Sequence, residues 1–528
     1  MKSFQIRLLT VVISILALSA CSEQQTKSKK QVTKSLTADL VLTNGIVFTG
    51  NSSQGQALDI AICGQIICGL YPSGSKKIIA KKLIDVSGKN VSPGFIDPHT
   101  HSLAELLSKD KNHNLNYLTQ GVTTVVNGND GGGPVNIKAT IEKLEKNGIG
   151  TNTALYVGHG SLREQVMGRE QRFATKTELT QMKSLMTKGM QDGAIGLSSG
   201  LYYVPGSYAN TEEVIEIAKV ASQYHGIYDT HLRDESTFTV GFIDALAEAI
   251  TIAKAADIHL HLAHIKALGV DVWGQSEAAI AKIEQAQKLG ISISADQYPW
   301  LASGTKLRSA VMPKWVMADS KQAFHRRLNQ ADLAERLNKE ITENIRRRGG
   351  PSALLITEFK DEQLVGLTLE DVAKLKNKSA VDTAISLVQQ GEVRVASFNM
   401  SPTDVETFMV QPWVVTSSDG TNGHPRKYAS FPTKYQNYVV NKKLLSLSDF
   451  INSSTAQTAK LLGLDKRGLL KKGYQADIIV FDPISYAPKA NFSHWNKYSV
   501  GVEQVVVNGE LVIENEQYQG ILAGKFVH

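Results

Sequence analysis

Eight apolar runs rich in β-branched residues constrain the fold of this chain more than any other feature. Each run ends in polar residues, and helix-like segments separate the early ones. Strands that alternate with helices build parallel βαβ units, and eight such units predict a closed (β/α)8 barrel of the TIM type, an α/β fold. The runs are Val91–His101, Gly121–Asp130, Asn152–His159, Ala194–Leu201, Gly226–Arg233, Ile258–Lys266, Ile291–Pro299 and Pro412–Gly420.

The segments between the runs support this alternation. In 211–225 the apolar residues share one helical face, and Asn210 and Glu213 have the spacing of a capping box. A doubly wound open sheet is the competing architecture. It is disfavoured because neither a glycine-rich phosphate fingerprint nor a Walker loop follows the first run.

Both ends of the chain differ in character from its middle. Residues 38–90 and 466–528 contain short strands and turns without helical spacing. We therefore expect the two terminal segments to form one small β-sandwich domain beside a barrel that spans 91–465. A long charged segment of about 314–408 lies between the seventh and eighth runs and predicts an insertion that shapes the active site.

The first twenty residues have the pattern of an export signal. A basic start at Lys2 and Arg7 precedes an apolar run at 8–18, which is too short to span a bilayer. Residues 18–21, Leu-Ser-Ala-Cys, resemble the lipobox of bacterial lipoproteins. We expect cleavage of the signal peptide 1–20 and lipidation of Cys21, with a plain secretory signal as the alternative.

A polar segment follows Cys21. Residues 21–37 predict a flexible tether, so the protein is expected to be exported and held on the cell envelope by a lipid anchor. In a Gram-negative cell it would face the periplasm, and Ser22 favours the outer membrane. No later segment is long and apolar enough to predict a membrane span.

The charge balance argues against nucleic acid as a partner. The chain has 57 Lys+Arg and 50 Asp+Glu, a net charge of +7. Four of the lysines that produce this positive charge lie in the tether, so the rest of the chain is near neutral. The 42% of hydrophobic residues is typical of a folded protein. Oligomeric state is left open by these features.

Two further cysteines lie in a predicted hairpin. A turn at Gly64-Gln65 would pair residue 63 with 66 and residue 61 with 68. In that register the thiols of Cys63 and Cys68 do not face each other, so two separate thiols are favoured over a disulfide, despite the exported setting.

Metal-binding residue types gather at the ends of the predicted strands. His99 and His101 are two residues apart on one strand, so both imidazoles point to the same side. The other candidates that end strands are Asp130, His231, His264 and Asp419. Two half-buried structural histidines would explain the His-x-His pair alone, but not all six residues. The mixed nitrogen and oxygen set favours Zn²⁺, as one ion or two, over manganese, iron or cobalt.

A hydrolytic reaction suits this set of residues. A bound metal converts water into a hydroxide nucleophile near neutral pH, and Asp419 is the expected catalytic base and acid that passes the proton to a leaving amine. His231 has an alternative role, which is to orient the scissile carbonyl. Serine catalysis is disfavoured because no Gly-x-Ser-x-Gly elbow is present.

Several segments, together with these residues, resemble the amidohydrolase superfamily and, within it, the D-aminoacylase (N-acyl-D-amino-acid deacylase) family. They occur in the family's order over most of 38–525. The segments are Val91–His101, Gly121–Val126, Gly193–Gly206, Thr230–Glu235, Ala263–Lys266, Tyr298-Pro299, His424–Arg426, Ser418–Gly420 and Gly473–Asp482.

The resemblance implies a division of the metal ligands. His99, His101 and Asp419 would hold one metal position, and His231 and His264 the other. The family commonly has a bridging cysteine at the end of the second strand, where this chain has Asp130. A carboxylate also bridges two metals but is less selective for zinc, which leaves metal identity and count open.

The resemblance also implies how substrate is held. The family binds the free α-carboxylate of its substrate with a lysine, a tyrosine and an arginine, which correspond to Lys266, Tyr298 and Arg426. An arginine fork and a lysine point charge suit a carboxylate.

These features together predict an enzyme, a metal-dependent hydrolase that cleaves the amide bond of N-acyl-D-amino acids or of short peptides that carry a D-residue. One alternative is a cyclic-amide hydrolase of the same superfamily, of the dihydroorotase or hydantoinase type. Its carboxylated bridging lysine has no counterpart in 127–131. The other alternative is a binding lipoprotein without activity, which the complete metal set argues against.

Overall fold

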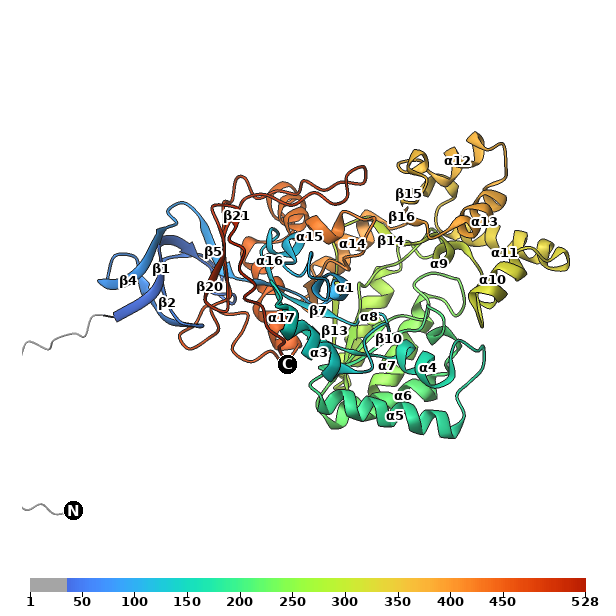
Figure 1. Ribbon diagram of the computed structural model, residues 1–528, viewed down its shortest axis with the longest axis horizontal. Helices are drawn as coiled ribbons and strands as arrows, with labels where there is room; N and C mark the ends of the chain where they lie inside the picture. Colours follow the sequence, from blue (N-terminus) through green and yellow to red (C-terminus); the bar gives the residue numbers. More distant parts are fainter. Residues whose placement is uncertain (1–35) are drawn as a thin grey trace, which may run out of the picture.

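The computed structural model describes residues 36–528. The expected signal peptide, the lipidation site Cys21 and most of the tether lie outside this range. The last two residues of the expected tether, Leu36 and Thr37, begin the first strand, β1 (Leu36–Val47). The barrel lies between a terminal β-domain at one end of the molecule and an insertion at the other (Figure 1).

The eight predicted runs form the parallel strands of the barrel. Six strands follow the order β17-β13-β12-β11-β10-β9, and the other sheet has the order β6-β7-β8. Only Tyr156 separates β8 from β9, and a parallel bridge between Thr100 and Gly420 joins the ends of β6 and β17. The strands are β6 (Phe95–Asp97), β7 (Val122–Asn127), β8 (Asn152–Leu155), β9 (Val157–Gly158), β10 (Gly196–Gly200), β11 (Ile227–His231), β12 (His259–Leu262), β13 (Ile293–Gln297) and β17 (Val414–Thr416).

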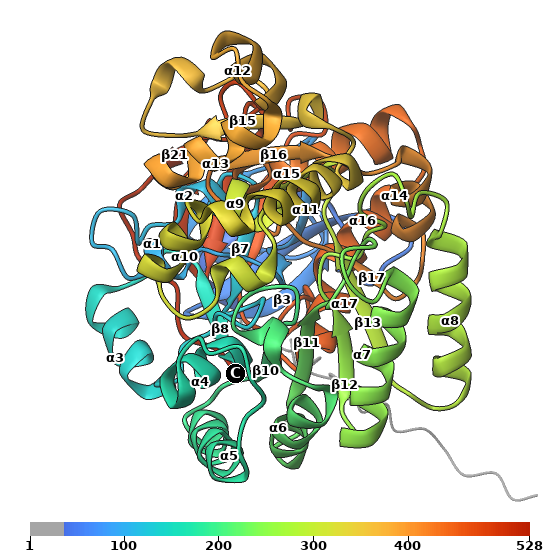
Figure 2. The same ribbon diagram turned by 90° about the vertical axis from the view of Figure 1, so that its right-hand side faces the viewer.

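Amphipathic helices cover the outside of the barrel (Figure 2). Their apolar faces and the strands share one large core, which confirms the predicted helical spacing. The main helices are α3 (Ile137–Asn147), α4 (His159–Met167), α5 (Lys176–Gln191), α6 (Thr211–Gln223), α7 (Phe242–Ala256), α8 (Ser276–Lys288), α14 (Pro402–Met409), α15 (Arg426–Lys434), α16 (Leu447–Ser454) and α17 (Ala456–Leu461). No helix within 36–528 is long and apolar enough to cross a membrane.

Helix α6 starts with only half of the expected capping box. The Asn210 side chain accepts from the Glu213 amide at 3.0 Å. The Glu213 carboxylate instead pairs with His159 at 2.8 Å and with Arg163. The buried contacts with His159 and Arg163 stabilise the Glu213 carboxylate more than a hydrogen bond from the exposed backbone amide of Asn210 would.

The first predicted run divides into two strands at Gly94. A Cβ at this residue would lie 2.1 Å from Thr123 Oγ1, so only glycine allows the strands to approach here. Before it, β5 (Asn90–Pro93) pairs with strands of the terminal domain. Residues 91–93 therefore belong to the terminal sheet, and the barrel begins at Phe95.

The terminal domain combines both ends of the chain in one nine-stranded sheet. The hydrogen-bonded order is β21-β20-β19-β18-β5-β1-β2-β3, with β4 on β1. Side chains of both terminal segments share a core, as expected for the β-sandwich domain. The strands not yet given are β2 (Gln56–Cys63), β3 (Ile66–Pro72), β4 (Ile78–Asp85), β18 (Ile478–Phe481), β19 (Val502–Val507), β20 (Glu510–Glu514) and β21 (Gln517–Tyr518).

Cys63 and Cys68 form a disulfide, so the expectation of two separate thiols was wrong. The turn is as predicted, because Cys63 lies opposite Ile66. The ladder then shifts by one residue, which pairs Ala61 with Gly69. This β-bulge turns the side chain of Cys68 toward Cys63 and brings their Cα atoms within 5.7 Å.

The insertion spans 302–398 and starts earlier than the expected 314. It has its own antiparallel sheet, β14-β16-β15, and its own apolar core. In Figure 2 its helices lie across one end of the barrel. Its elements are β14 (Ala302–Lys306), α9 (Leu307–Val311), α10 (Lys321–Leu328), α11 (Ala334–Arg347), β15 (Leu354–Glu358), α12 (Leu369–Leu375), α13 (Ala380–Gln390) and β16 (Arg394–Phe398).

Candidate metal centre

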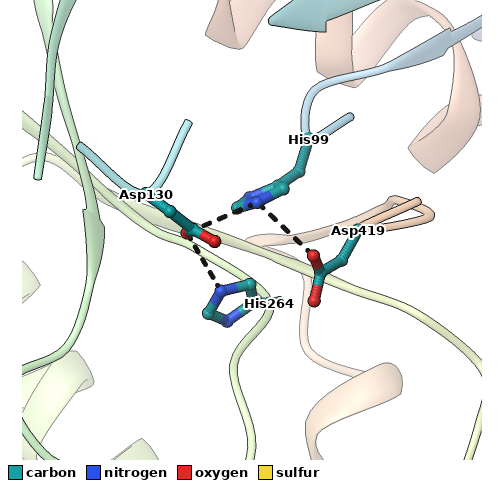
Figure 3. Close-up of side chains that lie close together, drawn as sticks. All are labelled: His99, Asp130, His264 and Asp419. Carbon is teal, nitrogen blue, oxygen red and sulfur yellow. Dashed lines mark hydrogen bonds and ion pairs between the residues drawn. The ribbon is translucent and has the colours of Figure 1, made fainter. Parts of the chain in front are cut away.

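Four of the predicted metal ligands meet where the barrel strands end. His99, Asp130, His264 and Asp419 follow β6, β7, β12 and β17, and each offers a donor atom within 4.8 Å of the others. Figure 3 shows the two carboxylates on either side of the His99 ring. Parallel strands bring their carboxyl ends to one face of a barrel, which is why residues so distant in sequence meet here.

His99 has the environment of a metal ligand. It is fully buried, and neither ring nitrogen has a hydrogen-bond partner within the described chain. Its Nε2 lies 3.5 Å from Asp130 Oδ1 and 3.7 Å from Asp419 Oδ1. A buried imidazole without a partner between two carboxylates fits a divalent cation.

His101 lies at the open side of the same group. Its Nε2 is 3.2 Å from Asp419 Oδ1 and 3.5 Å from Asp130 Oδ2, and the side chain is 30% exposed. His101 therefore lies within reach of a cation that His99, Asp419 and Asp130 would hold.

His231 and His264 mark a second position. His231 Nδ1 and His264 Nε2 face each other at 2.9 Å, and His264 Nε2 lies 3.2 Å from Asp130 Oδ1. Asp130 thus lies between the two positions, where the family resemblance implies a bridging ligand. The donors fit either one or two ions.

Glu235 is a neighbour that the sequence interpretation did not select. Its carboxylate lies 3.2 Å from His264 Nδ1 and 3.7 Å from His231 Nε2. It thereby orients the ring nitrogens that point away from the metal position, a role often taken by a carboxylate. Glu235 lies four residues after His231, and this spacing is the sequence feature that could have identified it.

A second missed carboxylate, Asp296, lies beneath the cluster. It is the penultimate residue of β13, is fully buried, contacts His261 Nε2 at 2.9 Å and lies 3.7 Å from His99 Nδ1. Asp296 is therefore the acidic group nearest to the Nδ1 side of His99, and its place near the end of the seventh strand could have identified it. His261 points to Asp296 rather than to the metal position.

Three of the clustered residues have left-handed backbone conformations. The φ angles are +56° at Asp130, +37° at His264 and +46° at Asp419. This region is uncommon for residues other than glycine, and such outliers concentrate at functional sites. The turn that it introduces directs each side chain from its strand end toward the barrel axis.

The carboxylates give the cluster a negative field. Burial opposes ionisation of Asp130, but His99 and His264 hold the pKa of Asp130 well below its usual value. Burial also opposes a charged imidazole at His264, yet Asp419, Asp130 and Glu235 raise the pKa of His264 to about 9. The site thus favours positive charge, which a metal ion would supply.

The predicted carboxylate-binding residues adjoin the cluster. Tyr298 lies between two cations, with Lys266 Nζ 5.7 Å and the Arg426 guanidinium 4.7 Å from its ring centre. Lys266 Nζ donates to Glu235 Oε1 at 2.7 Å, and Arg426 Nη1 pairs with Asp419 Oδ2 at 2.8 Å. Arg426 Nε is buried without a hydrogen-bond partner in the described chain, so this donor is left unsatisfied by the protein.

Two neighbouring hollows adjoin the cluster. The larger has a volume of about 490 Å³ and is lined by His101, Asp130, Asp419 and residues of the insertion. The smaller, of about 30 Å³, reaches His231, His264 and Lys266. Tyr203, Gly304, Thr305, Asp419 and Arg426 line both hollows. The cluster therefore has access to a ligand of the size of an acylated amino acid.

Comparison with known proteins places this geometry in a family. A model of the amidohydrolase family matches residues 82–513. The chain is 31% identical to a D-aminoacylase of Alcaligenes xylosoxydans xylosoxydans, with 92% of this chain and 97% of the relative covered.

Two solved structures share the fold across nearly the whole chain. A D-aminoacylase structure, described for its binuclear metal centre, has a TM-score of 0.79, 30% identity, and coverage of 93% of this chain and 100% of its own. An N-acyl-D-glutamate deacylase of Bordetella bronchiseptica, complexed with zinc and a phosphonate inhibitor that mimics the tetrahedral intermediate, has a TM-score of 0.79, 26% identity, and coverage of 93% and 99%. The extent of these matches and the strand-end cluster lead to one conclusion: the chain belongs to the amidohydrolase superfamily, in its D-aminoacylase family.

Proposed function

We propose that this protein hydrolyses the amide bond of N-acyl-D-amino acids, or of short peptides that carry a D-residue, to a carboxylic acid and a free amine. The observation that carries the proposal is the strand-end cluster of imidazoles and carboxylates next to two buried cations, Lys266 and Arg426. Amide hydrolysis needs both an activated water and a grip on the substrate, and these residues supply the two functions side by side.

The residues that would hold the metal are His99, His101, Asp130, His231, His264 and Asp419. A bound zinc ion supplies Lewis acidity, which lowers the pKa of water and polarises a carbonyl oxygen. Asp130 would be the ligand shared by the two positions, and Glu235 and Asp296 would help to orient the imidazoles.

Asp419 is the residue placed to move the proton. Burial opposes its ionisation, but Arg426 and His264 hold the pKa of Asp419 below its usual value. It is therefore a carboxylate that can accept a proton from water and return it to the departing amine nitrogen. Its ion pair with Arg426 fixes its direction.

Lys266 and Arg426 are proposed to hold the free α-carboxylate of the substrate, with Tyr298 as the aromatic support between them. The unpartnered Nε of Arg426 is the donor available for this contact. An amide held by its carboxylate beside the metal position has its scissile carbon fixed relative to Asp419.

Amine release from paired N-acetyl-D- and N-acetyl-L-amino acids tests this function. We expect hydrolysis of the D-series, loss of activity on chelation, and recovery when Zn²⁺ is restored. Absence of hydrolysis in both series, with bound metal verified by elemental analysis, would contradict the proposal and lead to tests of dipeptides and cyclic amides.

We also propose that the protein is exported and anchored to the cell envelope through lipidated Cys21. The lipobox-like residues 18–21 and the polar segment after them support this location. The Cys63–Cys68 disulfide is consistent with it, because disulfides persist mainly outside the reducing cytosol. Labelling with an alkyne fatty acid should modify the wild type and fail in Cys21→Ser, and equal labelling of both would rule out this anchor.

A further inference from the structure

Two cations of the insertion lie beside the active site without a carboxylate partner. Arg348, directly after α11, is 3% exposed and lines the smaller hollow together with His231, His264 and Asp419. Lys314, after α9, lines the larger hollow. Among the described residues, neither has an acidic oxygen within 4.0 Å. This is the opposite of Lys266 and Arg426, each of which has a carboxylate at 2.7 or 2.8 Å.

Tyr202 connects the two cations. Lys314 Nζ lies 3.0 Å from the centre of its ring, and Arg348 Nη2 lies 3.3 Å from its hydroxyl. The hydroxyl donates to Ser309 O at 2.9 Å. The cations therefore approach one aromatic side chain from different sides, each facing one hollow.

The remaining contacts of Arg348 are all with neutral groups. Its Nε donates to Ala310 O at 2.9 Å, and its guanidinium lies 5.4 Å from the centre of the Phe238 ring. Neutral dipoles and rings compensate only part of the cost of burying a charge. Burial and the Arg348 charge also lower the pKa of Lys314 well below its usual value, and the more distant Asp234 offsets this only in part.

We propose that Arg348 makes the enzyme selective for N-acyl-D-amino acids whose side chain carries a carboxylate, as in D-glutamate and D-aspartate derivatives, and that Lys314 adds a weaker electrostatic contribution from the other side of Tyr202. This inference rests on the proposed deacylase function. With the α-carboxylate held by Arg426 and Lys266, the side chain of the D-residue is the part that can enter the smaller hollow, which Arg426 and Lys266 also line.

The size and lining of the smaller hollow fit this occupant. It is small, about 30 Å³, and Arg348 lines it together with Arg426 and Lys266, so it suits a compact anionic group better than a large apolar side chain. The larger hollow, of about 490 Å³, is left for the acyl part of the substrate. A guanidinium binds a carboxylate with two parallel hydrogen bonds, which a neutral amide of the same shape cannot match.

The test compares N-acetyl-D-glutamate with its neutral isostere N-acetyl-D-glutamine. We expect the wild type to favour the glutamate derivative in kcat/KM by about tenfold or more, the order of one charge-assisted contact. Arg348→Met should lower kcat/KM for the glutamate derivative by about 100-fold, mainly through KM, and change the glutamine derivative by less than about threefold. Lys314→Met should have a smaller effect of the same kind, and Arg348→Lys should recover part of the loss.

Lys339→Met is the matched control, because it removes a cation from the exposed surface of α11. It should leave the ratio of the two substrates unchanged, since distant surface charges are screened. Equal kcat/KM for both substrates in the wild type would overturn the proposal. If Arg348→Met lowers kcat/KM equally for both substrates, Arg348 has only a structural role. If Lys314→Met also leaves the ratio of the two kcat/KM values unchanged, the proposal is wrong.

Calorimetric binding separates this inference from the proposed function. D-glutamate and D-glutamine are the probes, since binding of an amine product needs no turnover. Tighter binding of D-glutamate that is lost in Arg348→Met supports the anion site even if no N-acetyl substrate is hydrolysed. Equal affinity for the two probes contradicts it, whichever amides the enzyme cleaves.

Discussion

The barrel and the insertion both contribute charged side chains to the same hollows, but two cations of the insertion, Arg348 and Lys314, differ from the barrel charges because they have no carboxylate partner. At the strand ends every carboxylate of the cluster has an imidazole or guanidinium next to it, as Asp419 has His101 and Arg426. In the insertion Arg348 and Lys314 contact only neutral groups among the described residues.

This difference indicates that the two regions have different roles, catalysis in the barrel and substrate selection in the insertion. Paired charges on a rigid barrel are oriented before substrate arrives, which suits a chemical step that is the same for every amide. Unpaired cations are completed by the ligand, which suits discrimination among substrates. Substitutions in the barrel should therefore change turnover for all substrates, and substitutions in the insertion should change the preference among them.

Asp419→Asn should have the largest effect. It removes the proton acceptor but retains a side chain that tolerates the left-handed backbone, so we expect kcat to fall by about 10²–10⁴-fold for acidic and neutral N-acetyl-D-amino acids alike. Steady-state kinetics and metal analysis measure this. Asp382→Asn, an equal charge change at an exposed position of α13, is the control. A loss confined to one substrate would break the proposed separation of tasks.

Ile341→Ala tests the independence of the insertion. Ile341 is fully buried in the core of the insertion, and its truncation should cost about 2–5 kcal/mol of local stability. Hydrogen exchange should rise over 302–398 and not in the barrel, while metal content stays constant. Ile283→Ala, which makes an equivalent cavity under barrel helix α8, should do the reverse. Simultaneous loss of protection in both regions would show that they unfold together.

Asp130→Cys restores the thiolate that the family commonly has at this place. Because thiolate is the softer ligand, we expect slower release of zinc to a chelator, with kcat changed by less than about tenfold. Release rates followed with a chromogenic chelator measure this. Faster release than in the wild type would argue against a bridging role for Asp130.

Lys434→Met should have the smallest effect, and on stability alone. Burial of Lys434 in α15 lowers its pKa from 10.5 to about 7, so between these values the unfolded chain holds a proton that the folded chain does not. The wild type is therefore penalised increasingly as pH falls from about 10.5 to 7, and constantly below. The variant should gain Tm most at pH 7 or below and least near pH 10.

Thr416, the hydrogen-bond partner of Lys434, keeps a second partner in Ser454 after this change. Lys460→Met, on the exposed side of α17, should show no gain that depends on pH. A Tm difference independent of pH in Lys434→Met would mean that packing, and not ionisation, sets its effect.

The barrel and the cluster could be predicted because both depend on local patterns. Runs of β-branched residues locate the strands, and residues at strand ends meet by geometry alone, as His99 and His264 do. Glu235 and Asp296 were missed because they lie beside imidazoles rather than at the metal position, and their only sequence signal is their place, four residues after His231 and near the end of the seventh strand.

Other features depend on packing that a single sequence does not display. The disulfide depends on a one-residue shift in the pairing of β2 with β3 at Cys68, and the residues of the turn do not predict this shift. Arg348 is the last of three consecutive arginines, Arg346–Arg348, a pattern that is typical of a solvated helix end. It is buried only because the core of the insertion places the end of α11 against Tyr202.

The left-handed residues Asp130, His264 and Asp419 have a consequence for the energetics of the whole protein. Each costs about 1–3 kcal/mol relative to a relaxed backbone, and the folded chain bears this cost whether or not an ion is bound. The ligands are thus already in position before a metal arrives, so ion binding need not include a rearrangement of the chain. The strained backbone at these residues lowers the stability of the protein but keeps the site preformed. Substitutions that relieve the strain should therefore raise stability and lower activity.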